Sequence, residues 1–297
     1  MAAPPQALLR SLGFDTPTVL GQLVLSKRAA PMQDFRTDKH RIRPAAVAGA
    51  FYPENPARLR GLVEELLKHN SAAVDRPPKA LIIPHAGYIY SGPIAASAFS
   101  VLPAGTRRVV VVGPSHHFNF AGLAITRAAA FRTPLGTVPV DAVALDRIAS
   151  GPRVQPIEEA HRVEHSLEVM LPFLQMTLKE FTLVPIVSGN VSDQEMGEAL
   201  ELLWDRPDTR FIISSDLSHY YTYEEARQLD SKTAQAIERL RAKDIHADSA
   251  CGCVPIRGLI WCAQRYKLKA LTLDLRNSGD TAGPRDRVVG YGAFAFM

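Results

Sequence analysis

Three predicted strands in this sequence are each followed by side chains that bind metals or transfer protons. The pattern ALIIP precedes His85, RRVVVVG precedes His116 and His117, and RFIIS precedes Asp216 and His219. Neutral imidazole is a good ligand for iron, copper or zinc, and a histidine near a metal also exchanges protons close to neutral pH. The three stretches therefore predict either a metal site or an acid–base site.

These groups act together only if the strands that carry them end at one edge of a sheet. Runs of aliphatic, β-branched residues are typical of buried strands, and in open α/β sheets ligands bind at the carboxyl ends of the strands. We therefore expect one shared site. Asp216 lies three positions before His219 and is expected to orient its imidazole, the alternative being that Asp216 caps the following turn.

The periodicity of the chain predicts an α/β fold. Apolar residues at helical spacing predict helices over 56–70, 140–149 and 166–178, the second with Asp141 as its N-cap and the third kinked at Pro172. Short apolar runs between such segments predict strands. We expect a mixed, largely parallel central sheet with helices on both faces.

Composition and domain organisation are those of a globular protein. The 297 residues are 46% hydrophobic and 22% charged, which is typical of a soluble domain with a sizeable core. Residues 1–43 have no clear period and are expected to form an N-terminal extension, whereas residues 44–297 form the α/β domain. The small net charge of +4, without basic residues interleaved with aromatic ones, predicts no nucleic-acid partner.

The apolar runs and the cysteine count of the sequence predict where the protein is located. No apolar run is long enough to span a bilayer, so no membrane association is expected. The three cysteines are too few for a disulfide framework and suit a reducing compartment. We expect a cytoplasmic protein.

A second group of histidines lies in the stretch EAHRVEHSLEV. The segment from His161 to His165 matches the inverted zinc-protease pattern H-x-x-E-H, which requires both histidines on one helix face. Because the predicted helix begins only at Ser166, we interpret this match as chance. His165 either faces the site behind the metal ligands or is a hydrogen-bonded core histidine, and the sequence leaves both open.

Cys251 is the cysteine best placed for chemistry. It lies just before a predicted helix, whose N-terminus would lower the pKa of the thiol and favour thiolate; the alternative is a buried, inert cysteine. Cys262 has helical spacing with apolar neighbours and is interpreted as a core residue.

An ordered set of motifs extends these local observations. Along the chain lie VAGAFYP (47–53), PHAGYIYSG (84–92), GPSHH (113–117), TPLG (133–136), EHSLEVMLPFL (164–174), SSDLSHY (214–220), CG (251–252) and SGD…VVGYGA (278–293). This set resembles the Memo family, whose prokaryotic members include protein B of the AmmeMemoRadiSam system. The resemblance covers roughly residue 43 to the C-terminus, and it implies a fold similar to that of class III non-haem iron extradiol dioxygenases.

The resemblance also implies residue roles. It makes His85, His116 and Cys251 the metal ligands, His219 the acid–base residue and Asp216 its neighbour. In the dioxygenase relatives two histidines and a glutamate hold Fe(II). Here Cys251 stands in the place of that glutamate, so the third ligand differs from the dioxygenase pattern. A thiolate is softer than a carboxylate and shifts the preference toward Cu(I), Zn or thiolate-tolerant iron. Fe(II) is the expected cofactor, with Cu or Zn as alternatives.

Three functions are compatible with such a site. The first is a metal-dependent oxidoreductase that acts with O2 on a small phenolic or peptide-borne substrate. The second is a non-catalytic module that binds a metal or a peptide. The third is a metal-assisted hydrolase with His219 as the base. The association of the family with radical-SAM proteins implies protein partners in a modification pathway.

Overall fold

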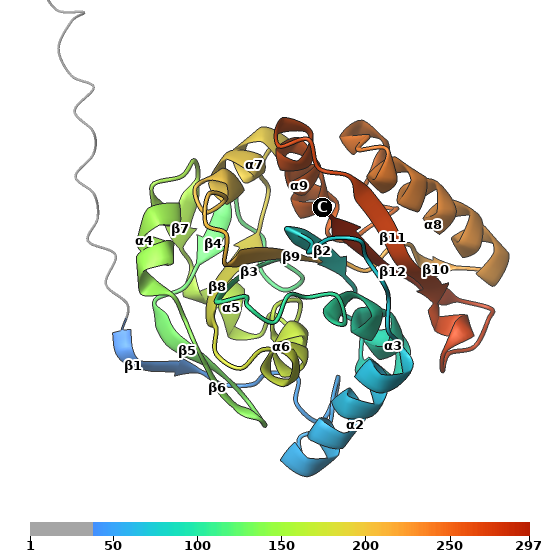
Figure 1. Ribbon diagram of the computed structural model, residues 1–297, viewed down its shortest axis with the longest axis horizontal. Coiled ribbons are helices and arrows are strands. Elements are labelled where there is room, and N and C mark those ends of the chain that lie inside the picture. The colour runs from blue at the N-terminus through green and yellow to red at the C-terminus, as the bar shows by residue number, and fades with distance from the viewer. Residues whose placement is uncertain (1–37) are drawn as a thin grey trace, which may run out of the picture. The chain divides into compact units, whose positions relative to one another are not determined.

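A computed structural model describes residues 38–297 (Figure 1). Its centre is a nine-stranded sheet. The strands are β2 (Ala80–Ile83), β3 (Arg108–Pro114), β4 (Leu123–Ile125), β7 (Val154–Pro156), β8 (Thr182–Ser188), β9 (Thr209–Ser214), β10 (His219–Tyr221), β11 (Ala270–Asn277) and β12 (Val288–Phe296). They lie in the order β10-β12-β2-β9-β3-β8-β4-β7, and β11 also pairs with β12.

The middle of the sheet is parallel and its flanks are mixed. Strands β2, β9, β3 and β8 all run in the same direction, with Ile82 opposite Ile213 and Val112 opposite Ile186. Strand β12 pairs antiparallel with β2, and β4 pairs antiparallel with β8. The predicted fold class, a mixed and largely parallel sheet, is confirmed.

Helices cover both faces of the sheet (Figure 1). On one face, Val110 and Val112 join a core with α4 (Ala142–Ala149), α7 (Asp193–Glu201), α8 (Tyr223–Glu238) and α9 (Cys253–Arg265). On the other, Val109 and Val111 join a core with α2 (Pro56–His69), α3 (Tyr88–Phe99) and α6 (Leu171–Thr177). Burial on both faces explains why β3 is apolar throughout rather than alternating. Within residues 38–297, no helix combines the length and apolar character needed to cross a membrane.

Helix starts follow the local chemistry. The side chain of Asp141 accepts from the backbone N–H of Ala144 and caps α4, as predicted. The helix expected over 166–178 is shorter: a 3-10 turn, η1 (Glu168–Met170), is followed by α6. Pro172 lies in the first turn of α6, where its missing N–H costs no hydrogen bond, so it helps to start a helix and does not kink one.

A second, three-stranded sheet consists of β1 (Asp38–Arg43), β5 (Ala128–Thr133) and β6 (Gly136–Pro139). Strand β1 pairs parallel with β5. Residues 38–43, expected to belong to the N-terminal extension, are therefore part of this sheet. Residues 1–37 of that expected extension lie outside the described part of the chain.

Candidate metal centre

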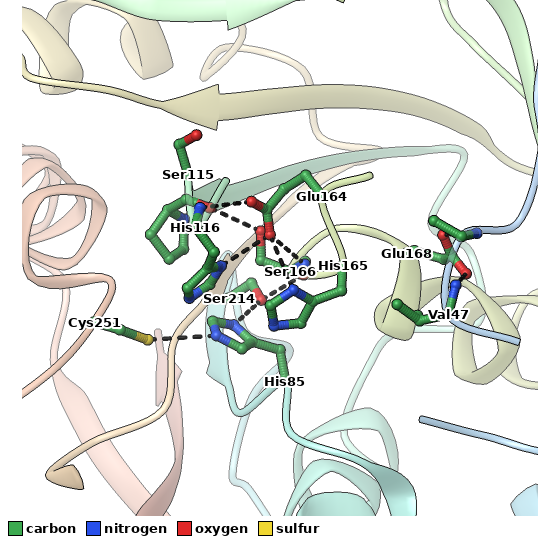
Figure 2. Close-up of polar contacts among 12 residues, drawn as sticks. Val47, His85, Ser115, His116, Glu164, His165, Ser166, Glu168, Ser214 and Cys251 are labelled. Carbon is green, nitrogen blue, oxygen red and sulfur yellow. Dashed lines mark hydrogen bonds and ion pairs between the residues drawn. The ribbon is translucent and has the colours of Figure 1, made fainter. Parts of the chain in front are cut away.

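Three adjacent parallel strands bring the predicted site residues to one edge of the sheet. His85 follows β2, His116 follows β3, and Asp216 follows β9, which lies between those two strands. The ring centroids of His85 and His116 are 5.1 Å apart. Figure 2 shows the two imidazoles facing the same space. The strand pattern therefore predicted this meeting point correctly.

The hydrogen bonds of His85 fix its tautomer. The Ser214 hydroxyl donates to the Ser166 carbonyl oxygen at 2.6 Å, so Ser214 Oγ can only accept from His85 Nδ1, which is 2.7 Å away. Nδ1 therefore carries the proton, and the lone pair is on Nε2, 3.4 Å from Cys251 Sγ (Figure 2). Burial, together with the neighbouring His116, holds the pKa of His85 well below its usual value. The ring is neutral, as a metal ligand must be.

His116 is held in the same way by a carboxylate. Its Nδ1 donates to Glu164 Oε1 at 2.9 Å, and its backbone N–H donates to Glu164 Oε2 at 2.7 Å. Burial alone would raise the pKa of Glu164, but hydrogen bonds from His116 and from the Ser166 backbone hold it well below its usual range. The carboxylate therefore stays charged and binds Nδ1, so Nε2 is the ring nitrogen of His116 that is left for a ligand.

His165 joins these two histidines and does not lie in the apolar core. Its ring centroid is 4.5 Å from that of His116 and 5.4 Å from that of His85. One ring nitrogen from each of the three lies within 4.8 Å of the others. Burial, with the neighbouring His116, lowers the pKa of His165 to about 4, so this ring is neutral at physiological pH. Of the two positions that the sequence left open for His165, the structure shows the one facing the site.

The match to H-x-x-E-H has no role as a unit. Helix α5 (Glu158–Arg162) ends before Glu164, and the buried His161 ring interacts with the Ala124 carbonyl oxygen at 3.1 Å. The interpretation of the match as chance is thus supported. The sequence analysis nevertheless did not identify Glu164 as the partner of His116. The one local pattern that pointed to Glu164 was its position next to His165.

Cys251 lies beside one histidine only. Its Sγ is 3.4 Å from His85 Nε2 and 3.6 Å from the Asp216 carbonyl oxygen, and no cluster among residues 38–297 combines it with all three histidines. The expected thiolate is not formed: burial, then the charge of Asp216, raises the pKa of Cys251 to about 12. Helix α9 begins two residues later, and burial outweighs its dipole. Cys251 would have to lose this proton to serve as a thiolate ligand.

Asp216 and His219 are both near the histidines but do not contact each other. Asp216 Oδ1 accepts from the His85 backbone N–H at 2.7 Å, and within the described residues it forms no hydrogen bond with His219. Asp216 therefore positions the His85 backbone in place of the expected role of orienting His219. Burial raises the pKa of Asp216 to about 7. Burial also lowers the pKa of His219, although the Leu217 carbonyl opposes that shift.

A cavity of about 500 Å³ opens in front of these residues. It is lined by Phe51, His85, Ala86, Gly87, Tyr90, His116, His165, Asp216, His219, Tyr220, Ser278, Gly283, Pro284, Arg287, Val289 and Tyr291. His219 faces this space, as an acid–base residue must. Tyr90 and Tyr220 line it, whereas Tyr88 is not among the lining residues and is buried, with its hydroxyl donating to the Val169 carbonyl oxygen at 2.6 Å. The volume is that of a small-molecule site.

One wall of the cavity is held in place by a buried carboxylate. Glu168, which is fully buried, pairs with Arg43 and accepts from the Val47 backbone N–H at 3.0 Å and from the Tyr52 hydroxyl at 2.5 Å. These contacts fix the loop that follows β1. The loop presents Phe51, whose ring lies 4.8 Å from that of His165.

The fold and site together define a class: α/β proteins with a histidine cluster, flanked by a cysteine, at the carboxyl edge of a mixed sheet. The family described as "Memo-like protein" matches residues 43–295. The chain belongs to the Memo family, which confirms the resemblance of the motifs.

Relatives of similar length support this assignment. A MEMO1 family protein of Aquifex aeolicus is 35% identical over 268 residues, covering 86% of this chain and all of the relative. A MEMO1 family protein of Saccharolobus islandicus is 33% identical over 281 residues, and one of Saccharolobus solfataricus is 34% identical over 284 residues. Each covers 86% of this chain and 99% of the relative.

Proposed function

We propose that the protein binds a redox-active transition metal through His85, His116 and Cys251. The observation that carries this proposal is the matched tautomer of the two histidines. Each donates from Nδ1 to a fixed oxygen, Ser214 Oγ or Glu164 Oε1, and each keeps its Nε2 lone pair for a ligand. Such hydrogen-bonded partners behind the ring are the usual companions of metal-bound histidine.

The donor set favours iron, with copper or zinc as alternatives. Two imidazoles and one thiolate suit Fe(II), Cu or Zn and exclude Mg²⁺ or Ca²⁺, which prefer oxygen ligands. His165 adds a third imidazole nitrogen facing the same space. Cys251 Sγ lies 3.4 Å from His85 Nε2, so these two proposed ligand atoms are already neighbours in the folded protein.

The proposed reaction is an O2-dependent oxidation of a small phenolic or peptide-borne substrate. The bound metal supplies redox capacity and Lewis acidity. His219, whose pKa is lowered by burial, is neutral near pH 7 and accepts a proton from the substrate hydroxyl. Phe51 and Tyr90 form aromatic walls that exclude water from the ring of the substrate.

Oxygen consumption by the iron-loaded protein tests the enzymatic part. A panel of phenols is offered to the wild type, to His219→Gln and to His69→Gln, a control on an exposed helix histidine. We expect substrate-dependent O2 uptake in the wild type and the control, and a loss of about 100-fold or more in His219→Gln at unchanged metal content. Metal binding with no O2 uptake for any phenol would instead support the non-catalytic binding module.

A further inference from the structure

We propose that the cavity has an anion-binding end at Arg287 and that its ligand carries a carboxylate or a phosphate monoester. This inference rests on the proposed function, because it assigns the substrate class of the same cavity. Arg287 lines the cavity together with His85, His116 and His219. A ligand held at Arg287 therefore extends into the space that the histidines share.

The charges around the cavity favour an anion. Among the lining residues, all of which lie in the described part of the chain, Arg287 is the one arginine or lysine. It is exposed and forms no ion pair with any residue in the range 38–297. Asp216 is the one acidic lining residue, and it is 5% exposed with Oδ1 bonded to the His85 backbone. Among residues 38–297, the guanidinium therefore has no carboxylate partner.

Tyr220 holds the guanidinium at the cavity. The Cζ of Arg287 lies 5.3 Å from the centroid of the Tyr220 ring, and that ring lies 5.8 Å from the ring of His219. Stacking on an aromatic face leaves the in-plane N–H groups of an arginine free, and this fork matches a carboxylate or a phosphate. Tyr220 thus connects the cation to the proposed acid–base residue.

The backbone supports a specific role for Tyr220. Its φ is +65°, a left-handed conformation that is uncommon for a tyrosine, and its side chain is 66% exposed. The register of β10 against β12 shifts between His219 and Tyr221, so Tyr220 is the extra residue of an irregular pair. Such irregularities redirect side chains beside functional sites, and this one places Tyr220 under Arg287.

A matched pair of probes tests the inference. Binding of para-hydroxyphenylacetate and of its neutral amide is measured by calorimetry on metal-free wild type, Arg287→Gln and Arg285→Gln. Arg285 lies on the same loop but stacks on Tyr223 and does not line the cavity, so its replacement controls for net charge and for loop perturbation. Phenyl phosphate, used in parallel, shows which anion binds more tightly.

We expect the wild type and Arg285→Gln to prefer the carboxylate over the amide by about tenfold, and Arg287→Gln to lose this preference. No preference in the wild type, or a preference that survives in Arg287→Gln, would overturn the inference.

The same probes are then measured on the metal-loaded wild type, Arg287→Gln and His85→Ala. A carboxylate preference that needs His85 and the metal, but not Arg287, would overturn the inference while leaving the metal site intact. A preference that depends on Arg287 in a protein that binds no metal would uphold the anion site and contradict the proposed function.

Discussion

The two histidines of the proposed centre obtain the same tautomer from different neighbours. His85 donates to a serine hydroxyl whose own proton is already used, and His116 donates to a carboxylate that backbone N–H groups keep charged. Both arrangements make Nε2 the ring nitrogen that is available to a ligand, without any metal present. The orientation is therefore a property of the folded protein, which reduces the reorganisation needed for metal binding.

Replacement of Ser214 by alanine tests this arrangement at one atom. Without Ser214 Oγ, His85 Nδ1 loses its acceptor, so both the ring orientation and the tautomer are no longer fixed. We expect the affinity for Zn²⁺, used as a redox-inert probe, to fall by about 10- to 100-fold. Ser97→Ala removes a buried serine on α3 that contacts Asp274 and should leave the affinity unchanged. Equal affinities in all three proteins would show that Ser214 does not position His85.

His161 gives a pH-dependence outside the site. Burial lowers its pKa to about 4, so the unfolded chain binds its proton more readily than the folded one. Stability should be at its full value above the ordinary histidine pKa and should fall as the pH decreases toward 4. This residue then accounts for a loss of about 2 kcal/mol between pH 7 and pH 5.

The measurement is the free energy of urea unfolding at these two pH values, for wild type and His161→Gln. Glutamine keeps an N–H donor for the Ala124 carbonyl but does not titrate. We expect the variant to lose about 2 kcal/mol less than the wild type on acidification. The same acid sensitivity in both proteins would show that His161 is not its source.

At the scale of elements, the site depends on close contact between β3 and the loop that carries Glu164 and His165. Gly113, near the end of β3, lies against Ser166 in this loop, and a Cβ at this position would be 2.8 Å from Ser166 Cβ. The absence of a side chain at Gly113 lets the loop approach closely enough for Glu164 to reach His116.

Gly113→Ala should push the loop away from the strand. We expect a loss of about 1–3 kcal/mol in the free energy of unfolding, together with weaker metal binding, because Glu164 would no longer hold His116. Gly61→Ala is the matched control: Gly61 is in α2 with nothing within 4 Å of the added Cβ, and alanine there should stabilise the helix by about 1 kcal/mol. Wild-type stability and affinity in Gly113→Ala would contradict this account of the contact.

The sequence was most informative where neighbours along the chain decide the structure. The apolar run Val109–Val112, stopped by glycine and proline, was enough to predict a buried strand and to place His116 at its end. The contacts of Glu164 with His116 join residues 48 positions apart, so no local pattern predicted them. The protonation of the Cys251 thiol could not be predicted from the sequence either. It depends on burial, which raises the pKa of the thiol more than the nearby helix N-terminus lowers it.

At the scale of the molecule, two apolar cores on opposite faces of the sheet fix the positions of β2, β9 and β3. Their carboxyl ends then bring His85, Asp216 and His116 together at one edge of the sheet. The loops add the remaining parts of the cavity: Glu164 and His165 from one segment, Cys251 from another. Residues 43–295, which match the Memo family, contain all of these groups. The proposed centre thus lies entirely within the part of the chain that matches the family.

The most direct test is the metal content of protein purified without oxygen, measured by mass spectrometry for the wild type, His85→Ala, Cys251→Ala and the surface control His69→Ala. We expect near-stoichiometric iron, or copper, in the wild type and the control, and its loss from both site variants. A wild type with no bound metal even after anaerobic reconstitution, or the same metal content in all four proteins, would show that His85 and Cys251 do not form a metal centre.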